Sequence, residues 1–120
     1  TTAKSLEDTL LKRLDQVDDL IAANSSNEKS INKLFDNMKC TFQKIGLVKY
    51  DAFQEMGGKL SFSLAMLNEE DDGFVINAVH SREGCYTYIK EIVGGNSIIV
   101  LADEEQEALD MAKEANKPAK

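Results

Sequence analysis

The sequence is poor in the residue types that most often carry chemistry. Its 120 residues include no tryptophan, one proline, one histidine and two cysteines. The cysteines, Cys40 and Cys85, lack the CxxC spacing of zinc and redox sites, and His80 has no second histidine near it. We therefore expect no metal, no cofactor and two reduced thiols, as is usual in a cytoplasmic protein.

Long apolar runs are also missing. No stretch approaches the roughly 18 consecutive apolar residues of a membrane-spanning helix, and no signal-peptide pattern is present. The chain begins with Thr1 rather than methionine, so we expect a preceding segment. Apolar residues make up 42% and charged residues 29%, proportions that disfavour wholesale disorder.

Positive charge is scarce in one part of the chain. The net charge is −7, and residues 1–46 carry seven basic and seven acidic side chains, so the whole excess lies in residues 47–120. An acidic domain repels phosphate groups, which disfavours binding to nucleic acid and to an anionic lipid surface.

The first third of the chain does contain an amphipathic helical pattern. Apolar residues recur at spacings of three and four, at Leu6, Leu10, Leu14, Val17 and Ile21. With Leu10 at heptad position d and Leu14 at a, Arg13 and Asp18 have the spacing of a salt bridge between parallel helices. We expect a homodimer whose stripe consists of Leu10, Leu14, Val17 and Ile21.

Residues 24–27 leave two interpretations of this helix. The stripe resumes in the same register at Ile31, Phe35, Met38, Phe42 and Ile45, which favours one helix of about 42 residues. However, Asn24–Asn27 is rich in residues that prefer caps and turns, and Ser25 with Glu28 fits a capping box. We prefer a stalk over residues 1–45 that breaks near 24–27, with Gly46 ending the second helix.

From residue 46 the apolar period changes to two, which predicts an antiparallel β-meander head over residues 46–116. We expect strands over 47–53, 60–67, 74–80 and 85–93, a possible fifth over 97–101, and a tail over 117–120. Asp103 and Gln106 have the spacing of a capping box, so the last helix should begin at Asp103. The expected fold class is α+β: a coiled-coil-like helix or helix pair, four to five strands, and a C-terminal helix.

The second strand shows two different faces. Leu60, Phe62, Leu64 and Met66 alternate with Ser61, Ser63 and Ala65. A head of this size buries little surface, so we expect the last helix and the segment containing Phe35 and Phe42 to cover the apolar face. The Ser61/Ser63 face would then lie in solvent or form a second interface.

Three blocks of the sequence resemble a known family. They run from Gly46 to Phe53 (GLVKYDAF), from Gly57 to Leu64 (GGKLSFSL) and from His80 to Glu83 (HSRE). Together they resemble the uncharacterised family called domain of unknown function 4446, found mainly in spore-forming Gram-positive bacteria. The resemblance implies a transmembrane anchor, a coiled coil and a β-rich cytoplasmic domain, and it names no function, because no enzymatic activity or ligand is established for the family.

Turn residues offer the remaining candidates for function. Glu69–Gly73 lacks the ligand spacing of an EF-hand, and Gly57-Gly58 lacks the Lys-Ser/Thr pair and the strand-helix context of a P-loop, so we expect both to be ordinary turns. His80 could act as a general base, but no partner is placed near it by spacing, so we expect no catalytic residue. The best candidates for an interaction patch are His80, Arg82, Glu83, Tyr86 and Tyr88.

These patterns favour a protein-interaction or scaffold domain. We expect it to dimerise through its N-terminal helix, to bind an unknown protein partner, and to lie at the cytoplasmic face of the cell membrane through an anchor outside this chain. The alternative is a small-ligand sensor that signals through the helix and has an enclosed apolar cavity. An enzyme built around His80 and Glu83 is the third hypothesis.

Overall fold

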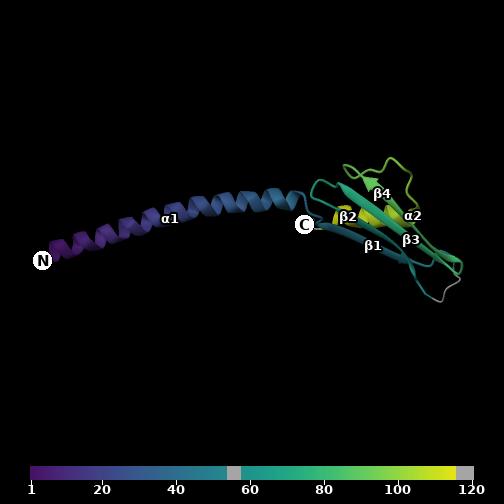
Figure 1. Ribbon diagram of the computed structural model, residues 1–120, viewed down its shortest axis with the longest axis horizontal. Helices are drawn as coiled ribbons and strands as arrows, with labels where there is room; N and C mark the ends of the chain where they lie inside the picture. The colour runs from purple at the N-terminus through teal and green to yellow at the C-terminus, as the bar shows by residue number, and fades with distance from the viewer. Residues whose placement is uncertain (54–57, 116–120) are drawn as a thin grey trace. The chain divides into compact units, whose positions relative to one another are not determined.

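The computed structural model describes residues 1–53 and 58–115. Contacts divide the chain into two compact units, Thr1–Asn37 and Met38–Lys120. Figure 1 labels the elements of both. The fold class is α+β, as the sequence predicts, with a long N-terminal helix, a four-stranded antiparallel sheet and a C-terminal helix.

The first helix, α1, spans Thr2–Lys39 without interruption (Figure 1). The preferred break at 24–27 was therefore wrong, and the stripe continues through Asn24–Asn27 in one helix. An exposed asparagine or serine costs a helix only about half a kcal/mol, too little to stop a helix that good formers propagate on both sides. None of the described helices has an apolar stretch long enough to cross a membrane.

α1 ends six residues earlier than position 45. Thr41 closes its last turn, because both its backbone N–H and its hydroxyl donate to the carbonyl of Met38, at 3.1 and 2.8 Å. Gly46 therefore does not end a helix. It lies inside the first strand, and the head begins before residue 46.

The sheet has the strand order β1-β2-β3-β4, with every neighbouring pair antiparallel. The strands are β1 (Lys44–Tyr50), β2 (Ser61–Leu67), β3 (Gly73–Ser81) and β4 (Gly84–Ile92). The fifth strand over 97–101 was wrong for the described residues: after β4 the chain turns through Gly94 and Gly95, both with positive φ, and makes a single bridge between Val93 and Asn96. The tail over 117–120 lies outside the described residues.

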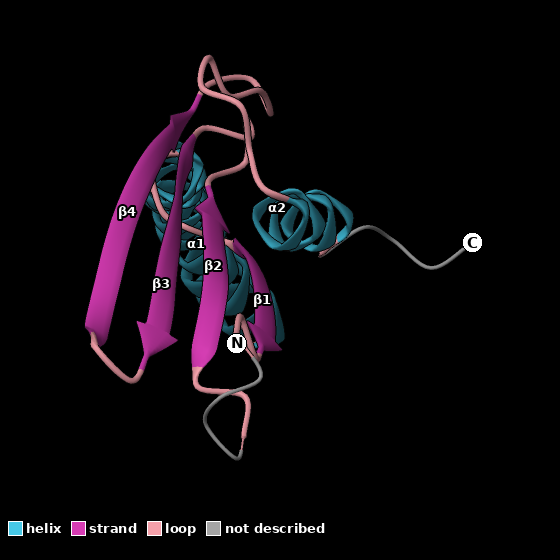
Figure 2. Ribbon diagram, turned by 90° about the vertical axis from the view of Figure 1, so that its right-hand side faces the viewer, coloured by secondary structure: helices cyan, strands magenta, loops and turns pink. Residues whose placement is uncertain are grey.

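The last helix, α2, spans Asp103–Glu114, and its N-cap is Ala102 rather than Asp103. The Glu105 carboxylate accepts the Ala102 N–H at 3.0 Å, which satisfies a donor that the first turn leaves free. Figure 2 shows α2 lying across one face of the sheet.

α2 covers the face of the sheet that carries small side chains. The prediction that this helix covers the face containing Phe62 was therefore wrong. Ser61 and Ser63 are 1% and 0% exposed. A Cβ added to Gly46 would lie 2.0 Å from the carbonyl oxygen of Ala108, which shows how closely α2 approaches β1. The core formed in this way consists of Ala65, Leu67, Val75, Ile92, Ala108, Leu109 and Ala112.

Candidate functional site

The opposite face of the sheet is an apolar surface without a covering element among the described residues. Strand alternation and the pairing register place three residues of β1, three of β2, four of β3 and four of β4 on it. This open face consists of Ile45, Leu47 and Lys49 of β1, Phe62, Leu64 and Met66 of β2, Phe74, Ile76, Ala78 and His80 of β3, and Cys85, Thr87, Ile89 and Glu91 of β4. Ten of these fourteen residues are apolar, cysteine included, which is unusual for a surface in contact with water.

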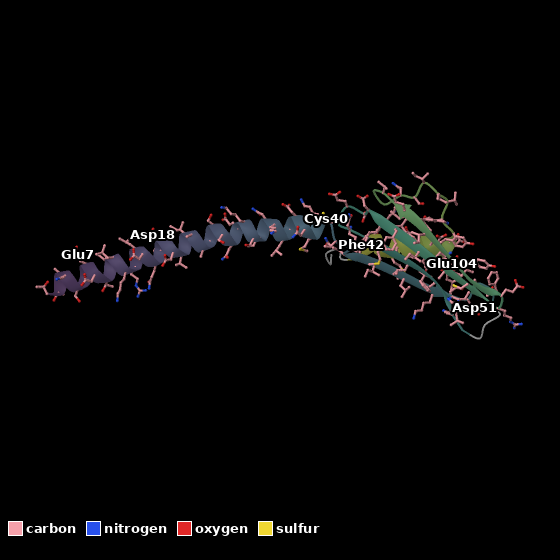
Figure 3. The ribbon with its side chains drawn as sticks, in the orientation of Figure 1. Glu7, Asp18, Cys40, Phe42, Asp51 and Glu104 are labelled. Atoms are coloured by element: carbon pink, nitrogen blue, oxygen red, sulfur yellow. The ribbon has the colours of Figure 1, made fainter. Side chains whose placement is uncertain are left out.

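Exposure is greatest at the two edges of the open face. Ile45 and Leu47 on β1 are 55% and 43% exposed, and Ile89 on β4 is 68% exposed. Phe42, labelled in Figure 3, lies in the segment that leads into β1, and its ring meets Phe74 edge to face with centroids 5.3 Å apart. Part of the expected Phe35/Phe42 cover is therefore present, as one aromatic ring at one end of the face.

A hollow adjoins the β4 edge of the open face. Its volume is about 320 Å³, and it is lined by Glu91, Val93, Asn96, Ile98 and Ile99. The loop that forms it is strongly exposed, since Ile98 has its full side-chain surface in solvent. The hollow thus combines apolar walls with a single carboxylate.

The helix-covered face contains a buried polar layer. The Asn77 amide oxygen accepts hydrogen bonds from the Tyr50 hydroxyl at 2.6 Å and from the Ser63 hydroxyl at 2.9 Å. The Ser61 hydroxyl accepts the backbone N–H of His80 at 2.9 Å. Burial raises the pKa of Tyr50 above 10.0, its ordinary value, and this outweighs the lowering of the pKa by the hydrogen-bonded contact with Asn77. The layer is satisfied internally, which indicates a structural role.

An ion pair joins β4 to the first turn of α2. The Lys90 ammonium lies 2.8 Å from Oε1 of Glu105, whose side chain is only 2% exposed, and it also donates to the carbonyl of Val100 at 3.0 Å. Oε2 of Glu105 is buried and has no hydrogen-bond partner among the described residues. A buried carboxylate of this kind depends on its cation, because leaving it unpaired would carry a large desolvation cost.

The predicted interaction patch is only partly brought together. Arg82, Glu83 and Tyr86 join Phe53 and Ser81 around a hollow of about 310 Å³ at the β3–β4 turn. Strand alternation then places Tyr88 on the same side of β4 as Tyr86, and both tyrosines are more than half exposed.

His80 faces the other side of the sheet. It pairs across the strands with Cys85, and its Nε2 lies 3.6 Å from Sγ. This contact follows from the hairpin register, which sequence spacing alone does not provide.

The acidic segment Glu69–Gly73 behaves as a turn. The Asn68 side chain accepts the backbone N–H groups of Glu70 and Asp72, at 2.9 and 3.1 Å. Asp71 adopts a positive φ of 62° and pairs with Lys44 at 2.8 Å. Over residues 1–53 and 58–115, no group of three or more His, Cys, Asp or Glu side chains is placed to hold a metal ion. Gly57 of the Gly57-Gly58 turn lies outside the described residues.

The stripe of α1 is exposed along its whole length in the described chain. Leu10, Leu14, Val17 and Ile21 are 56%, 60%, 48% and 63% exposed, and α1 has no buried residue. Farther along the helix, Ile31, Phe35 and Met38 continue the stripe with exposures of 49%, 59% and 48%. The chain therefore presents two extended apolar surfaces, the α1 stripe and the open face.

The open face was missed at the sequence level, although a signal for it exists. The alanines of α2, such as Ala108 and Ala112, form a thin apolar surface that can approach a sheet only where the opposing side chains are small. The Ser61/Ser63/Ala65 side of β2 offers such side chains, whereas the side with Phe62 does not. A comparison of the side-chain sizes on α2 with those on each face of β2 would have placed α2 on the face containing Ser61 and Ser63.

Comparison with known proteins gives a family and no neighbour of established activity. No curated protein and no solved structure matches the chain. The family model described as "Protein of unknown function (DUF4446)" matches residues 1–113, which is nearly the whole chain. The chain therefore belongs to this family of unknown function, the one that its GLVKYDAF, GGKLSFSL and HSRE blocks resemble.

Proposed function

We propose that this chain is a protein-interaction or scaffold domain that dimerises through α1 and presents its head to a protein partner. The observation that carries the proposal is the unpartnered stripe of α1. A helix of 38 residues in water gains most of its stability from packing an apolar face, so an exposed stripe of this length needs a partner. The heptad register makes a second copy of α1 the natural partner, with Leu10 and Leu14 in the seam.

Tethering is the second part of the proposal. The family resemblance leads us to place the domain at the cytoplasmic face of the cell membrane, held by an anchor outside this chain. The helix would then act as a stalk of about 57 Å, at 1.5 Å per residue. Membrane fractionation of the native protein, with and without a carbonate wash, tests this part, and full recovery in the soluble fraction would contradict it.

The head offers a contact surface for the partner at the β3–β4 turn. Arg82, Glu83 and Tyr86 surround a hollow there, and tyrosine and arginine are enriched at protein interfaces. A photo-crosslinking amino acid at Tyr88 should give one discrete adduct in cells, whereas the same group at Glu107, on the exposed side of α2, should not. Equal labelling at both positions would contradict a specific contact.

The sensor hypothesis gains no such support from the packing. α2 lies so close to β1 that Gly46 has no room for a Cβ, and Ala108 and Ala112 are completely buried. A ligand chamber between α2 and the sheet would have to displace these contacts. The interaction proposal needs no rearrangement, because its surfaces are already exposed.

Molar mass is the direct test of dimerisation. Light scattering on the full chain should give about twice its 13.3 kDa, and the Leu14→Glu/Ile21→Glu variant should be monomeric, because both charges would lie in the seam. Ala22→Glu is the matched control, since position 22 lies outside the stripe and should leave the dimer intact. A wild-type chain that stays monomeric at high concentration would overturn the proposal.

A further inference from the structure

Three rows of the open face cross all four strands, and they carry two charged residues at diagonally opposite corners; His80 and Cys85 form a shorter row beyond Thr87. Lys49 lies on β1 in the row that ends at Thr87, and Glu91 lies on β4 in the row that begins at Ile45. Among the described residues neither forms an ion pair. A covering partner must therefore neutralise one positive and one negative corner while it buries the apolar residues between them.

The patch between these corners is close to square. Three strand spacings of about 4.8 Å separate β1 from β4, which is about 14 Å, and four residues of about 3.4 Å each separate the rows of Lys49 and Glu91, which is also about 14 Å. A square patch can be superimposed on itself after a rotation of 90°. Sheets are known to pack face to face in this orthogonal way as well as nearly aligned.

Twofold symmetry allows four ways to place this face on a second copy of itself. The two aligned arrangements put Lys49 opposite Thr87 or Ile45 of the second copy and leave its charge unpaired. One orthogonal arrangement puts Lys49 opposite Lys49. The other orthogonal arrangement puts Lys49 opposite Glu91 and Glu91 opposite Lys49, so both charges are paired and the apolar residues meet each other.

The hollow beside Glu91 fits the same arrangement. Its apolar walls, which include Val93 and Ile98, suit the aliphatic stem of a lysine, and Glu91 supplies the carboxylate for the ammonium group. In the arrangement that pairs both corners, Lys49 of the second copy lies at this hollow. Neither the hollow nor the corner charges take part in the core of one copy. Both fit the same occupant, the open face of a second copy.

The size of the patch predicts how strongly the faces bind. With the side chains of its outermost residues included, the patch measures roughly 20 by 20 Å, which is about 400 Å² on each copy and about 800 Å² in total. This total is below the roughly 1,200 Å² that a stable complex buries. Free heads should therefore associate weakly. The helix dimer proposed above would raise the effective concentration of the second head to about millimolar, and the inference rests on that proposal for this step only.

We propose that the open face binds the open face of a second copy of this chain, with the strands crossing near 90° and Lys49 of each copy paired with Glu91 of the other. The second copy is preferred over a different protein because the two charges sum to zero and complement themselves under one rotation. This interface leaves the β3–β4 turn patch accessible for a further partner.

Crosslinking of the full chain tests the pairing. In a Cys40→Ser/Cys85→Ser background, Lys49→Cys/Glu91→Cys should form a covalent dimer in high yield with a short bismaleimide, whose reach matches the ~10 Å between packed sheets. Within one copy these positions are about 20 Å apart, so they cannot be bridged internally. Lys49→Cys alone and Glu91→Cys alone are the matched controls, because each cysteine then lies a full diagonal away from its equivalent in the second copy, and each should give at least fivefold less dimer.

The outcomes separate this inference from helix dimerisation. Equal yields from all three variants, or no product from Lys49→Cys/Glu91→Cys in a chain whose molar mass is that of a dimer, would overturn the face pairing and leave the helix dimer standing. A Leu14→Glu/Ile21→Glu chain that is monomeric when dilute but still joins positions 49 and 91 at millimolar concentration would support the face pairing without the helix.

A charge exchange provides a test that needs no new cysteine. Lys49→Glu and Glu91→Lys should each place like charges at both corners, separate the faces and raise the fluorescence of an anilinonaphthalene dye severalfold. The double variant Lys49→Glu/Glu91→Lys restores both pairs and should return the signal to the wild-type level. Fluorescence that rises further in the double variant would contradict the pairing.

Discussion

At the scale of single residues, the fold depends on close approach and on buried polar partners. Gly46 and the Tyr50–Asn77–Ser63 cluster both lie under α2. The glycine could be recognised from the sequence only as a turn or cap residue. Its real constraint, contact with a carbonyl of α2, depends on a helix more than 50 residues away in the sequence.

Gly46→Ala should destabilise the head by about 3 kcal/mol, because the added methyl would collide with the backbone of Ala108. Gly58→Ala is the matched control, since a Cβ there meets nothing within 4 Å. Urea denaturation followed by tyrosine fluorescence measures both, and all three tyrosines lie in the head. Equal midpoints for the two variants would contradict the close approach.

Tyr50 makes stability depend on alkaline pH. Because burial raises its folded pKa above the ordinary 10.0, its contribution to stability is fully present below pH 10 and is lost as pH rises through the folded value. Tyr50→Phe should cost about 1 kcal/mol at pH 7 through the lost hydrogen bond to Asn77. It should also lose less stability than the wild type between pH 10 and 11.5. Parallel pH profiles of the two proteins would argue against a buried hydroxyl.

At the scale of elements, the sequence predicts the four strands and both helices but not their covers. Period-two alternation identifies the strands because successive side chains of a strand point to opposite faces of the sheet. The break at Asn24–Asn27 and the fifth strand at 97–101 failed for one reason: local preferences of well under 1 kcal/mol per residue were weighed against elements whose stability comes from longer stretches. The face chosen by α2 depends on side-chain size, which a binary apolar pattern does not record.

The Lys90–Glu105 pair holds β4 against the start of α2. Lys90→Met should cost about 3 kcal/mol, because it leaves a carboxylate buried and unpaired, whereas Lys90→Met/Glu105→Leu should recover most of that loss. Lys59→Met, at an exposed position, serves as the control and should change stability by less than about 0.5 kcal/mol. If the double variant were no more stable than Lys90→Met, an unpaired Glu105 carboxylate could not be the cause of the stability lost in Lys90→Met.

At the scale of the whole molecule, the chain exposes two apolar surfaces, the α1 stripe and the open face. The α1 stripe could be predicted from the sequence because heptad spacing records it directly. The open face could not, because the expected lid was assigned to it. Of the predicted interaction patch, Arg82, Glu83 and Tyr86 line one hollow, whereas sequence spacing could not show that His80 faces the opposite side of the sheet.

The most direct measurement is spontaneous disulfide formation along the stripe of α1. In a Cys40→Ser/Cys85→Ser background, Leu10→Cys and Ile31→Cys each occupy a d position, one on either side of residues 24–27, and Asp15→Cys occupies the outer b position. If two continuous helices pair in parallel and in register, both d-position variants should form covalent dimers nearly completely and Asp15→Cys should not. If neither Leu10→Cys nor Ile31→Cys formed a covalent dimer, the parallel pairing of two α1 helices would be contradicted.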